Sequence, residues 1–374
     1  MALQLCGFLI EWGCGNDGEV VGYHVWANAP SGVGPGHQYD CERNSLVWIG
    51  HRAQRRGGSH DADCRLHPYS LLHRHSGGAT RALGFMTEVR SLDHFIVLHS
   101  DLQQARQVYE MLGFNVGPVR RHVELGSSNC IVYLDQTYLE LIDFGESADW
   151  LSAPYQDFIA CGSGIPHVSI RSFDLVKDRA RMLANGHNPD DILSARRKVV
   201  LPGGHEDETA SSCFYVWRKD NLYLSLFLTE HEKPETIFVP EYVDHPNSAV
   251  EVSRLVYMSN RPGDDADYFC SLFGKGLQTN SESGFSIVGR RGEVTEVLTP
   301  GAARERYGSA LIRPESSPLD GFAAAIHFQV SSLNRCKRLL RENGTAVAEK
   351  QRSIMVPASV GSGVVMVFEQ DQTL

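Results

Sequence analysis

Two histidines occupy the same position in two similar stretches of the sequence. His94 lies in the apolar run LDHFIVLH, 19 residues before Gly113, and His167 lies in IPHVSI, 19 residues before Gly186. Neutral imidazole is the commonest metal ligand among protein side chains. The equal register therefore predicts a metal site to which two copies of one structural unit each contribute a histidine.

A carboxylate is the natural third ligand. Glu140 lies in TYLELIDF, where its neighbours are apolar, and a buried carboxylate is costly unless a cation or a strong donor is close. Two histidines and one carboxylate suit non-haem Fe(II) and can also hold Zn, Mn or Ni. Aligning YLEL of TYLELIDF with YLSL of NLYLSLFL places Ser225 opposite Glu140, so a second carboxylate is missing. The alternative is a purely structural trio, because histidines in apolar strands often bond only to the backbone.

The elements that must position these residues recur four times. Each of four helix-like segments closes with a glycine, which can take the left-handed conformation that ends a helix. These glycines are Gly113, Gly186, Gly274 and Gly344. Runs rich in β-branched and aromatic residues precede them, at Leu92 to Leu98, Pro166 to Ile170, Val252 to Met258 and Ala324 to Val330. Short polar residues stand where the helices should start, at Asp101, Ser172 or Asp174, Asp264, and Ser331 or Ser332. The repeating unit is predicted to be a strand, a helix and about three more strands, which makes an α+β protein.

Composition limits the class of protein. The chain has 374 residues and a formal charge of −10, and its apolar runs fall short of the roughly 20 residues that a membrane helix needs. Nucleic-acid binders concentrate Lys and Arg on one face, which argues against a nucleic-acid partner here. The nine cysteines include no C-x-x-C pair, so we interpret them as reduced residues of a cytoplasmic protein. The expected partner is a small-molecule substrate, with neither nucleic acid nor membrane, and a homodimer is one expected assembly.

The N-terminal 88 residues differ from the rest. The first 85 contain no lysine but hold seven of the sixteen histidines, and they show no sustained periodicity of strand or helix type. We interpret residues 1–88 as a disordered or non-native extension, with Met86 as a candidate for the true start.

From residue 90 onward the sequence resembles the glyoxalase-like branch of the vicinal oxygen chelate superfamily, which includes bleomycin-resistance proteins and extradiol dioxygenases. The resemblance rests on LDHFIVLHSDLQQARQVYEMLGFNVG, LGSSNCIVYLDQTYLELIDF, LSLFLTEHEKPETIFVPEYVDHPNSAVEVSRLVYMS, GEVTEVLTP and GVVMVF. It implies tandem βαβββ modules paired into two half-open barrels, with a divalent metal often held in the cup by His, Gln or Glu. The implied domains are a first barrel at residues 89–232, a linker at 233–250 and a second, degenerate barrel at 251–374.

The second barrel is poor in ligands. Arg254 stands at the position of His94, and Glu296 stands at that of Glu140. The fourth module offers Ala325, with His327 two residues further on. An Arg254–Glu296 salt bridge and a supporting role are therefore expected for this half, with capture of an anionic group by Arg254 as the alternative.

Two functions of different classes remain. The first is a metal-dependent lyase, isomerase or dioxygenase that acts on a small oxygen-bearing substrate, with His94, Glu140 and His167 as ligands. Tyr138 and His122 are then the candidates for moving a proton. The second is a metal-free protein that sequesters a small molecule, as bleomycin-resistance relatives do.

Overall fold

A computed structural model describes residues 89–122, 125–145, 152–160, 163–274, 278–311 and 320–370, together with three N-terminal strands. The chain divides into two compact units, 1–73 and 74–374. In the first unit, β1 (Ala2–Leu5), β2 (Phe8–Cys14) and β3 (Val20–Ala27) form an antiparallel sheet. Most of residues 1–88, Met86 included, lies outside the described residues, so the interpretation of this extension stays a prediction.

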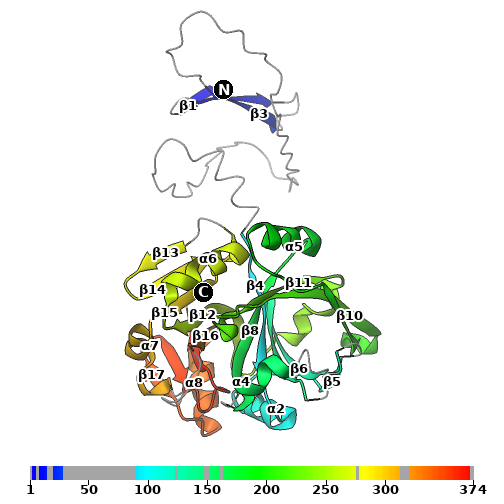
Figure 1. Cartoon of the computed structure of the whole chain (residues 1–374), viewed down its shortest axis with the longest axis vertical. Helices are drawn as coiled ribbons and strands as arrows, with labels where there is room; N and C mark the ends of the chain where they lie inside the picture. Colours follow the sequence, from blue (N-terminus) through cyan, green and yellow to red (C-terminus); the bar gives the residue numbers. More distant parts are fainter. Residues whose placement is uncertain are drawn as a thin grey trace, which may run out of the picture. The chain divides into compact units, whose positions relative to one another are not determined.

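The second unit contains four βαβββ modules (Figure 1). The first comprises β4 (Leu92–Leu98), α2 (Leu102–Met111), β5 (Arg120–Arg121), β6 (Ser128–Leu134) and β7 (Thr137–Asp143). The second comprises β8 (Gly164–Arg171), α5 (Leu175–Ala184), β9 (Leu193–Val200), β10 (Glu206–Val216) and β11 (Leu226–His231). The third comprises β12 (Ala249–Ser259), α6 (Pro262–Phe273), β13 (Gln278–Ser281), β14 (Gly284–Val288) and β15 (Val294–Leu298). The fourth comprises β16 (Gly321–Val330), α8 (Leu333–Glu342), β17 (Ala348–Lys350), β18 (Ser353–Val356) and β19 (Val365–Glu369). Between modules lie the helices α4 (Gln156–Ala160) and α7 (Pro300–Tyr307).

Modules pair into two eight-stranded sheets, ordered β5-β6-β7-β4-β8-β11-β10-β9 and β13-β14-β15-β12-β16-β19-β18-β17. In each sheet the first strands of two modules are antiparallel neighbours, and each has the last strand of its own module as a parallel neighbour. The predicted fold, an α+β protein with two paired sets of βαβββ modules, is confirmed.

The predicted helix ends are also found. Gly113, Gly186, Gly274 and Gly344 follow α2, α5, α6 and α8 with positive φ angles. Gly113 illustrates why glycine is required, since its φ is +84° and an added Cβ would lie 2.9 Å from the Cβ of Asn247. The Asp101, Asp174 and Ser332 side chains accept hydrogen bonds from the first turns of their helices. The prediction for Asp264 was wrong, because α6 starts at Pro262 with Arg261 as its N-cap, and proline is favoured in the first turn.

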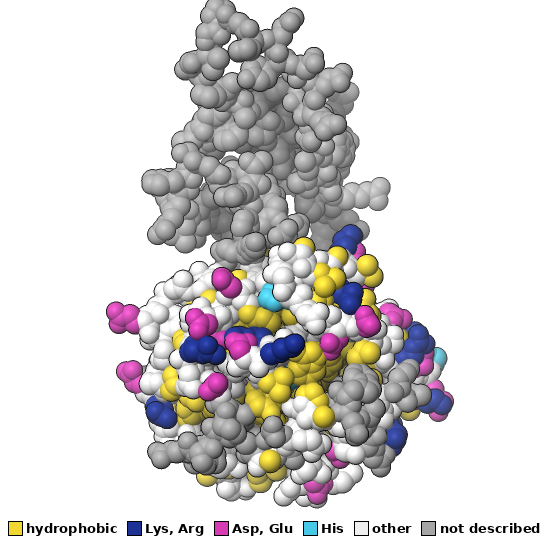
Figure 2. All heavy atoms as spheres, in the orientation of Figure 1, with side chains coloured by type: hydrophobic (Ala, Val, Ile, Leu, Met, Phe, Trp, Pro, Cys, Tyr) yellow, Lys and Arg dark blue, Asp and Glu magenta, His cyan; other side chains and the backbone are white. Residues whose placement is uncertain are grey.

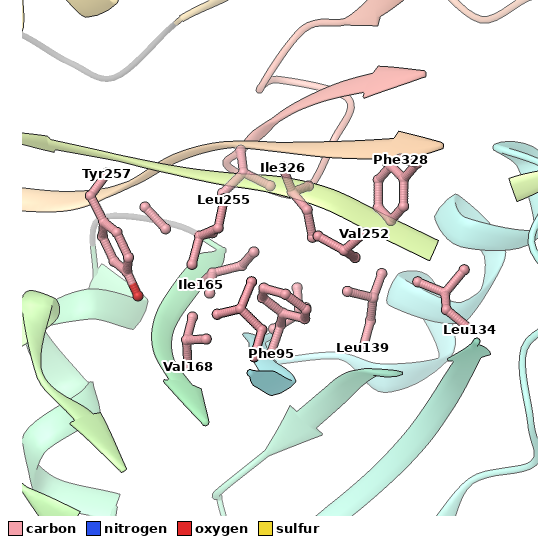
Figure 3. Close-up of a cluster of buried hydrophobic side chains, with 14 of the residues drawn as sticks. Phe95, Leu134, Leu139, Ile165, Val168, Val252, Leu255, Tyr257, Ile326 and Phe328 are labelled. Atoms are coloured by element: carbon pink, nitrogen blue, oxygen red, sulfur yellow. The ribbon is translucent and has the colours of Figure 1, made fainter. Parts of the chain in front are cut away.

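The two sheets share one apolar core between their facing surfaces. Figure 3 shows Phe95 of β4 and Val168 of β8 lying against Leu255 of β12 and Ile326 of β16, and all four side chains are buried. Removing an aromatic or branched aliphatic side chain from water contributes about 1.5–3 kcal/mol. Because odd and even residues of a strand point to opposite faces, the opposite face of the first sheet carries His94 and Ile96.

Two surface properties bear on the expected partners. On the face drawn in Figure 2, basic and acidic side chains are interspersed around exposed apolar atoms, so this face has no single sign of charge. None of the helices in the described residues is long and apolar enough to cross a membrane.

Candidate metal and catalytic site

A β-bulge in β4 places Asp93 beside His94. Leu92 pairs with Ile170 and Phe95 pairs with Val168, so two residues of β4 stand opposite one residue of β8. A bulge of this kind re-aims side chains that would otherwise alternate between faces. The side chains of Asp93 and His94 can therefore bond to each other although they are sequence neighbours.

The two ring nitrogens of His94 have different partners. Nδ1 lies 2.6 Å from Asp93 Oδ1, whereas Nε2 lies 3.7 Å from Glu140 Oε2. A proton on Nδ1 satisfies the carboxylate of Asp93 and leaves the lone pair of Nε2 directed at Glu140. At 3.7 Å the second contact is too long for a hydrogen bond and is suited to two ligands of one cation, whose bonds run about 2.0–2.2 Å.

Asp93 is the centre of a buried charge cluster. Its carboxylate accepts from His231 Nε2 at 2.9 Å and from Arg171 Nε at 2.6 Å, in addition to His94. Burial by itself would raise the pKa of Asp93, but His231, His94 and Arg171 together hold that pKa well below its usual range. The carboxylate is therefore ionised and fixes the orientation of His94.

Within the described residues, three groups that could bind a metal lie close together. The ligand atoms of Asp93, His94 and His231 are all within 4.8 Å of one another. Their short contacts are those of hydrogen bonds, and the Arg171 guanidinium opposes a further cation at Asp93. The arrangement resembles the support of a metal-bound histidine, in which the second ring nitrogen donates to a carboxylate.

Glu140 is oriented by a second network. Asn129 Nδ2 donates to Glu140 Oε1 at 2.6 Å and lies 3.2 Å from His122 Nε2. His122 Nδ1 lies 2.8 Å from Ser127 Oγ. The amide of Asn129 has two hydrogens, so this geometry assigns Nε2 of His122 as an acceptor and its Nδ1 as the donor to Ser127. One oxygen of Glu140 is thereby held in place, and the other faces His94.

Tyr138 covers His94. The two rings are stacked, with centroids 4.5 Å apart and an angle of 6° between their planes. Burial, followed by the charges of Asp93 and Glu140, raises the pKa of Tyr138 well above its usual range. Tyr138 lines the same cavity as His94, and its hydroxyl stays protonated, so it can donate a hydrogen bond but cannot serve as a base near neutral pH.

The third predicted ligand, His167, lies on the same sheet face but has different surroundings. Ile96 pairs with Glu140 on β7 and with His167 on β8, so the three side chains form one row across the sheet. His167 is thus a diagonal neighbour of His94, at a spacing of roughly 7–8 Å between Cα atoms for antiparallel strands. The ligand atoms of His94, Glu140 and His167 do not all lie within 4.8 Å of one another, whereas those of Asp93, His94 and His231 do.

Aromatic rings enclose His167. Its ring makes edge contacts with Tyr155, Tyr215 and Trp217, with centroids 4.8–5.5 Å apart. Both ring nitrogens are buried and have no hydrogen-bond partner among the residues that the structure describes. Burial lowers the pKa of His167 to about 3, so the ring is neutral, which is the form that binds metal.

The position that matches Glu140 in the second module is occupied by Phe227. Ser169, two residues after His167, pairs with Phe227, just as Ile96, two residues after His94, pairs with Glu140. The sequence alignment that placed Ser225 there was wrong by two residues, because Ser225 is the C-cap of a short 3-10 turn (Leu222–Leu224) and precedes β11. The Phe227 ring contacts both histidines, with centroids 5.1 Å from His94 and 6.5 Å from His167.

A cavity of about 80 Å³ opens over His94 and Glu140. Its polar lining also includes His122, Asn129 and Arg197. Sequence reasoning did not single out Asp93 or Arg197. The signal for Arg197 was present in LSARRKVV, where it shares a strand face with Ala195 and Val199.

Residues 92–269 match the family described as "Glyoxalase-like domain". A comparison with curated proteins gave no match.

Three solved structures show similar arrangements of the chain. A hypothetical protein from Staphylococcus aureus gives a TM-score of 0.53 at 10% identity, over 76% of this chain and 100% of its own. The Mn(II)-bound glyoxalase from Novosphingobium aromaticivorans gives 0.45 at 12% identity, over 76% and 82%. A mutant of 4-hydroxymandelate synthase from Streptomyces coelicolor gives 0.48 at 9% identity, over 76% and 93%. The first likeness supports the fold, and none of the three defines a substrate or a ligand set for this chain.

Fold and sequence define the class of protein. Residues 92–269 belong to the glyoxalase-like domain family, within the vicinal oxygen chelate superfamily that the sequence motifs indicated.

Proposed function

We propose that the glyoxalase-like half is a metal-dependent enzyme that acts on a small molecule with two neighbouring oxygen atoms. The supporting observation is the pair of facing ligand atoms, His94 Nε2 and Glu140 Oε2, 3.7 Å apart and each oriented from behind by Asp93 or Asn129. Two groups with lone pairs directed at each other inside a protein favour a cation between them.

The proposed ligands are His94, Glu140 and His167. His167 fits this role because it is neutral, lies on the same face and has two buried nitrogens without partners in the described part of the chain. These residues would hold a divalent cation, which would supply Lewis acidity at a carbonyl or enolate oxygen of the substrate.

The chain's own residues have separate tasks in this proposal. Asp93 keeps the proton of His94 on Nδ1, and Asn129 holds Glu140. Tyr138, whose pKa is raised by burial, donates a hydrogen bond or a proton to a substrate oxygen in the cavity. His122 acts through Asn129 as a positioning residue for Glu140.

A second function has its own supporting observation. Phe227 stands where a fourth ligand would stand, and aromatic rings surround His167. A metal-free protein that binds a small apolar molecule needs such a lining.

Metal content distinguishes the two. The full chain, purified without chelator and reconstituted with Fe(II), Mn(II), Zn(II) or Ni(II), is analysed by plasma mass spectrometry beside His94→Ala, Glu140→Gln and His167→Gln. Arg254→Ala, at the matching position of the second half, is the control. Near-stoichiometric metal in the wild type and the control, lost in the three variants, is expected. A wild type without metal after reconstitution would instead leave the binding protein as the function, and iron among the retained metals would favour oxygen chemistry.

A further inference from the structure

A buried positive charge, that of Arg197, lines the cavity and forms no ion pair with the residues that the structure describes. Arg197 lies on β9, whose residues alternate between buried and exposed near its end, and its exposed fraction is 7%. Its neighbours Arg196 and Lys198 point to the exposed face. Arginine is almost never buried to this degree unless it is paired.

Among the described residues, the guanidinium of Arg197 has one hydrogen-bond partner. Nη2 donates to the hydroxyl of Tyr133 at 3.0 Å. In the part of the chain that the structure describes, no Asp or Glu oxygen lies within 4.0 Å of the guanidinium, although the other buried arginine there, Arg218, is paired with Asp265. A guanidinium has five N–H donors in a planar fork, and a phenol oxygen satisfies one of them.

Arg197 also lies where two cavities meet. Together with Ile131 and Tyr133 it lines both the 80 Å³ cavity over His94 and Glu140 and a neighbouring cavity of about 280 Å³. The second cavity is lined by Val116, Pro118 and Val199 and also contains Glu241, which makes no ion pair with Arg197. The free donors therefore border space that is large enough for a small organic molecule and is mainly apolar.

We propose that Arg197 binds the carboxylate of the substrate, which makes the substrate a small organic acid with an apolar body. The planar fork of Arg matches a carboxylate in two parallel hydrogen bonds, and a water-poor pocket strengthens such a pair. Placing the acid group at Arg197 leaves the rest of the molecule between Ile131 and Tyr133 and directs it toward His94 and Glu140. The identification of this acid as a substrate rests on the proposed function, whereas the anion site itself does not need the metal.

The test uses the chelator-treated full chain and three pairs of probes that differ in charge but not in shape. These are acetate and acetamide, benzoate and benzamide, and 3-phenylpropionate and 3-phenylpropionamide. Dissociation constants are measured by ligand-observed NMR for the wild type, Arg197→Gln and Arg197→Lys. Arg196→Gln is the matched control, because it removes one arginine from the other face of the same strand.

Hydrogen bonds to a charged group contribute about 1.5–3 kcal/mol, so at least one acid should bind the wild type roughly tenfold or more tightly than its amide. This preference should disappear in Arg197→Gln, persist in part in Arg197→Lys and remain unchanged in Arg196→Gln. Equal binding or no binding of every acid and amide by the wild type overturns the proposal. The same holds if Arg197→Gln keeps the preference.

A second readout separates a binding role from a structural one. A buried cation without a partner destabilises the fold, so Arg197→Gln should have a melting temperature equal to or above that of the wild type when no acid is present. A lower melting temperature would instead indicate a structural role for Arg197. Because metal is absent throughout, these results are independent of the metal analysis. If the protein prefers acids to amides but takes up no metal, the proposed anion site stands and the proposed metal-dependent function does not.

Discussion

The two halves of the molecule share a backbone detail but differ in what they place on it. β12 carries a bulge between Val252 and Arg254, at the position of the bulge between Leu92 and Phe95 in β4. In the first half this bulge presents Asp93 and His94, and in the second it presents Ser253 and Arg254. In both halves, the residue two positions further along this strand pairs with a glutamate on the parallel neighbouring strand. Ile96 pairs with Glu140, and Val256 pairs with Glu296.

The difference lies in how each half satisfies its buried polar groups. Arg254 Nη1 bonds to Glu296 Oε1 at 2.7 Å, and Arg306 also pairs with Glu296. The position of His167 is taken by Ala325, and that of Phe227 by Val367. The second half neutralises its glutamate internally, whereas the first leaves Glu140 facing His94 at 3.7 Å. One backbone thus supports either a closed ion pair or an open site, and side-chain identity at a few positions decides between them.

The largest difference in stability between the two halves is expected when Asp93 is removed. Asp93→Ala leaves Arg171 and His231 without their buried counter-charge, which should cost about 3–5 kcal/mol of unfolding free energy. The matching change Ser253→Ala removes a 2.8 Å hydrogen bond to Glu369 and should cost about 1 kcal/mol. Urea unfolding of both variants measures the difference. Equal losses of unfolding free energy would show that Asp93 stabilises the first half no more than Ser253 stabilises the second.

The pH dependence of stability sharpens the contrast between His167 and Ala325. The folded-state pKa of His167 is about 3, below the unfolded value of about 6.5, so between these values the unfolded chain binds one proton more. This histidine therefore lowers stability as pH falls below about 6.5, by at most about 1.4 kcal/mol per pH unit, and has no effect above pH 7.

His167→Gln should flatten the stability profile of the chelator-treated protein between pH 4 and 6 by this amount. Urea unfolding at each pH measures it. Other buried histidines such as His99, whose pKa is lowered to about 4, contribute equally to both proteins. If stability falls equally with pH in the wild type and in His167→Gln, then His167 is protonated in the folded state or accessible to water.

The smallest expected effect concerns the closed ion pair. A double-mutant cycle with Arg254→Met and Glu296→Gln should give a coupling energy of about 1 kcal/mol or less, because Arg254 is about one-third exposed and Arg306 remains beside Glu296. Metal content should not change in either variant. A coupling energy of several kcal/mol would assign this pair a larger role in holding the second sheet together.

The fold could be predicted because its signals are local and repeated. A helix-closing glycine and the strand before each helix recur four times, and all four helices end where predicted. The start of α6 could not be read from Asp264 alone, since Pro262 offers an equally good first-turn residue.

The site could be predicted only in part. The proximity of His94 to Glu140 follows from strand order, which the repeat indicates. The link between Asp93 and His94 depends on a bulge, because regular alternation would point adjacent residues to opposite faces. The two-residue error at Ser225 has a similar origin, since a 3-10 turn just before β11 shifts the pairing of that strand.

The apolar core between the two sheets limits how far the chain can be shortened. The family match ends at residue 269, inside α6, yet β12 needs β16 as its antiparallel partner, and Phe95 and Val168 need Leu255 and Ile326 as their covering layer. A gene shortened to the matched segment would encode a sheet with an exposed apolar back and an unpaired edge. The half that carries an ion pair in place of a site is therefore needed to cover the apolar face of the first sheet. A substitution at Leu255 or Ile326 is also a substitution in the layer that packs behind the strand of His94.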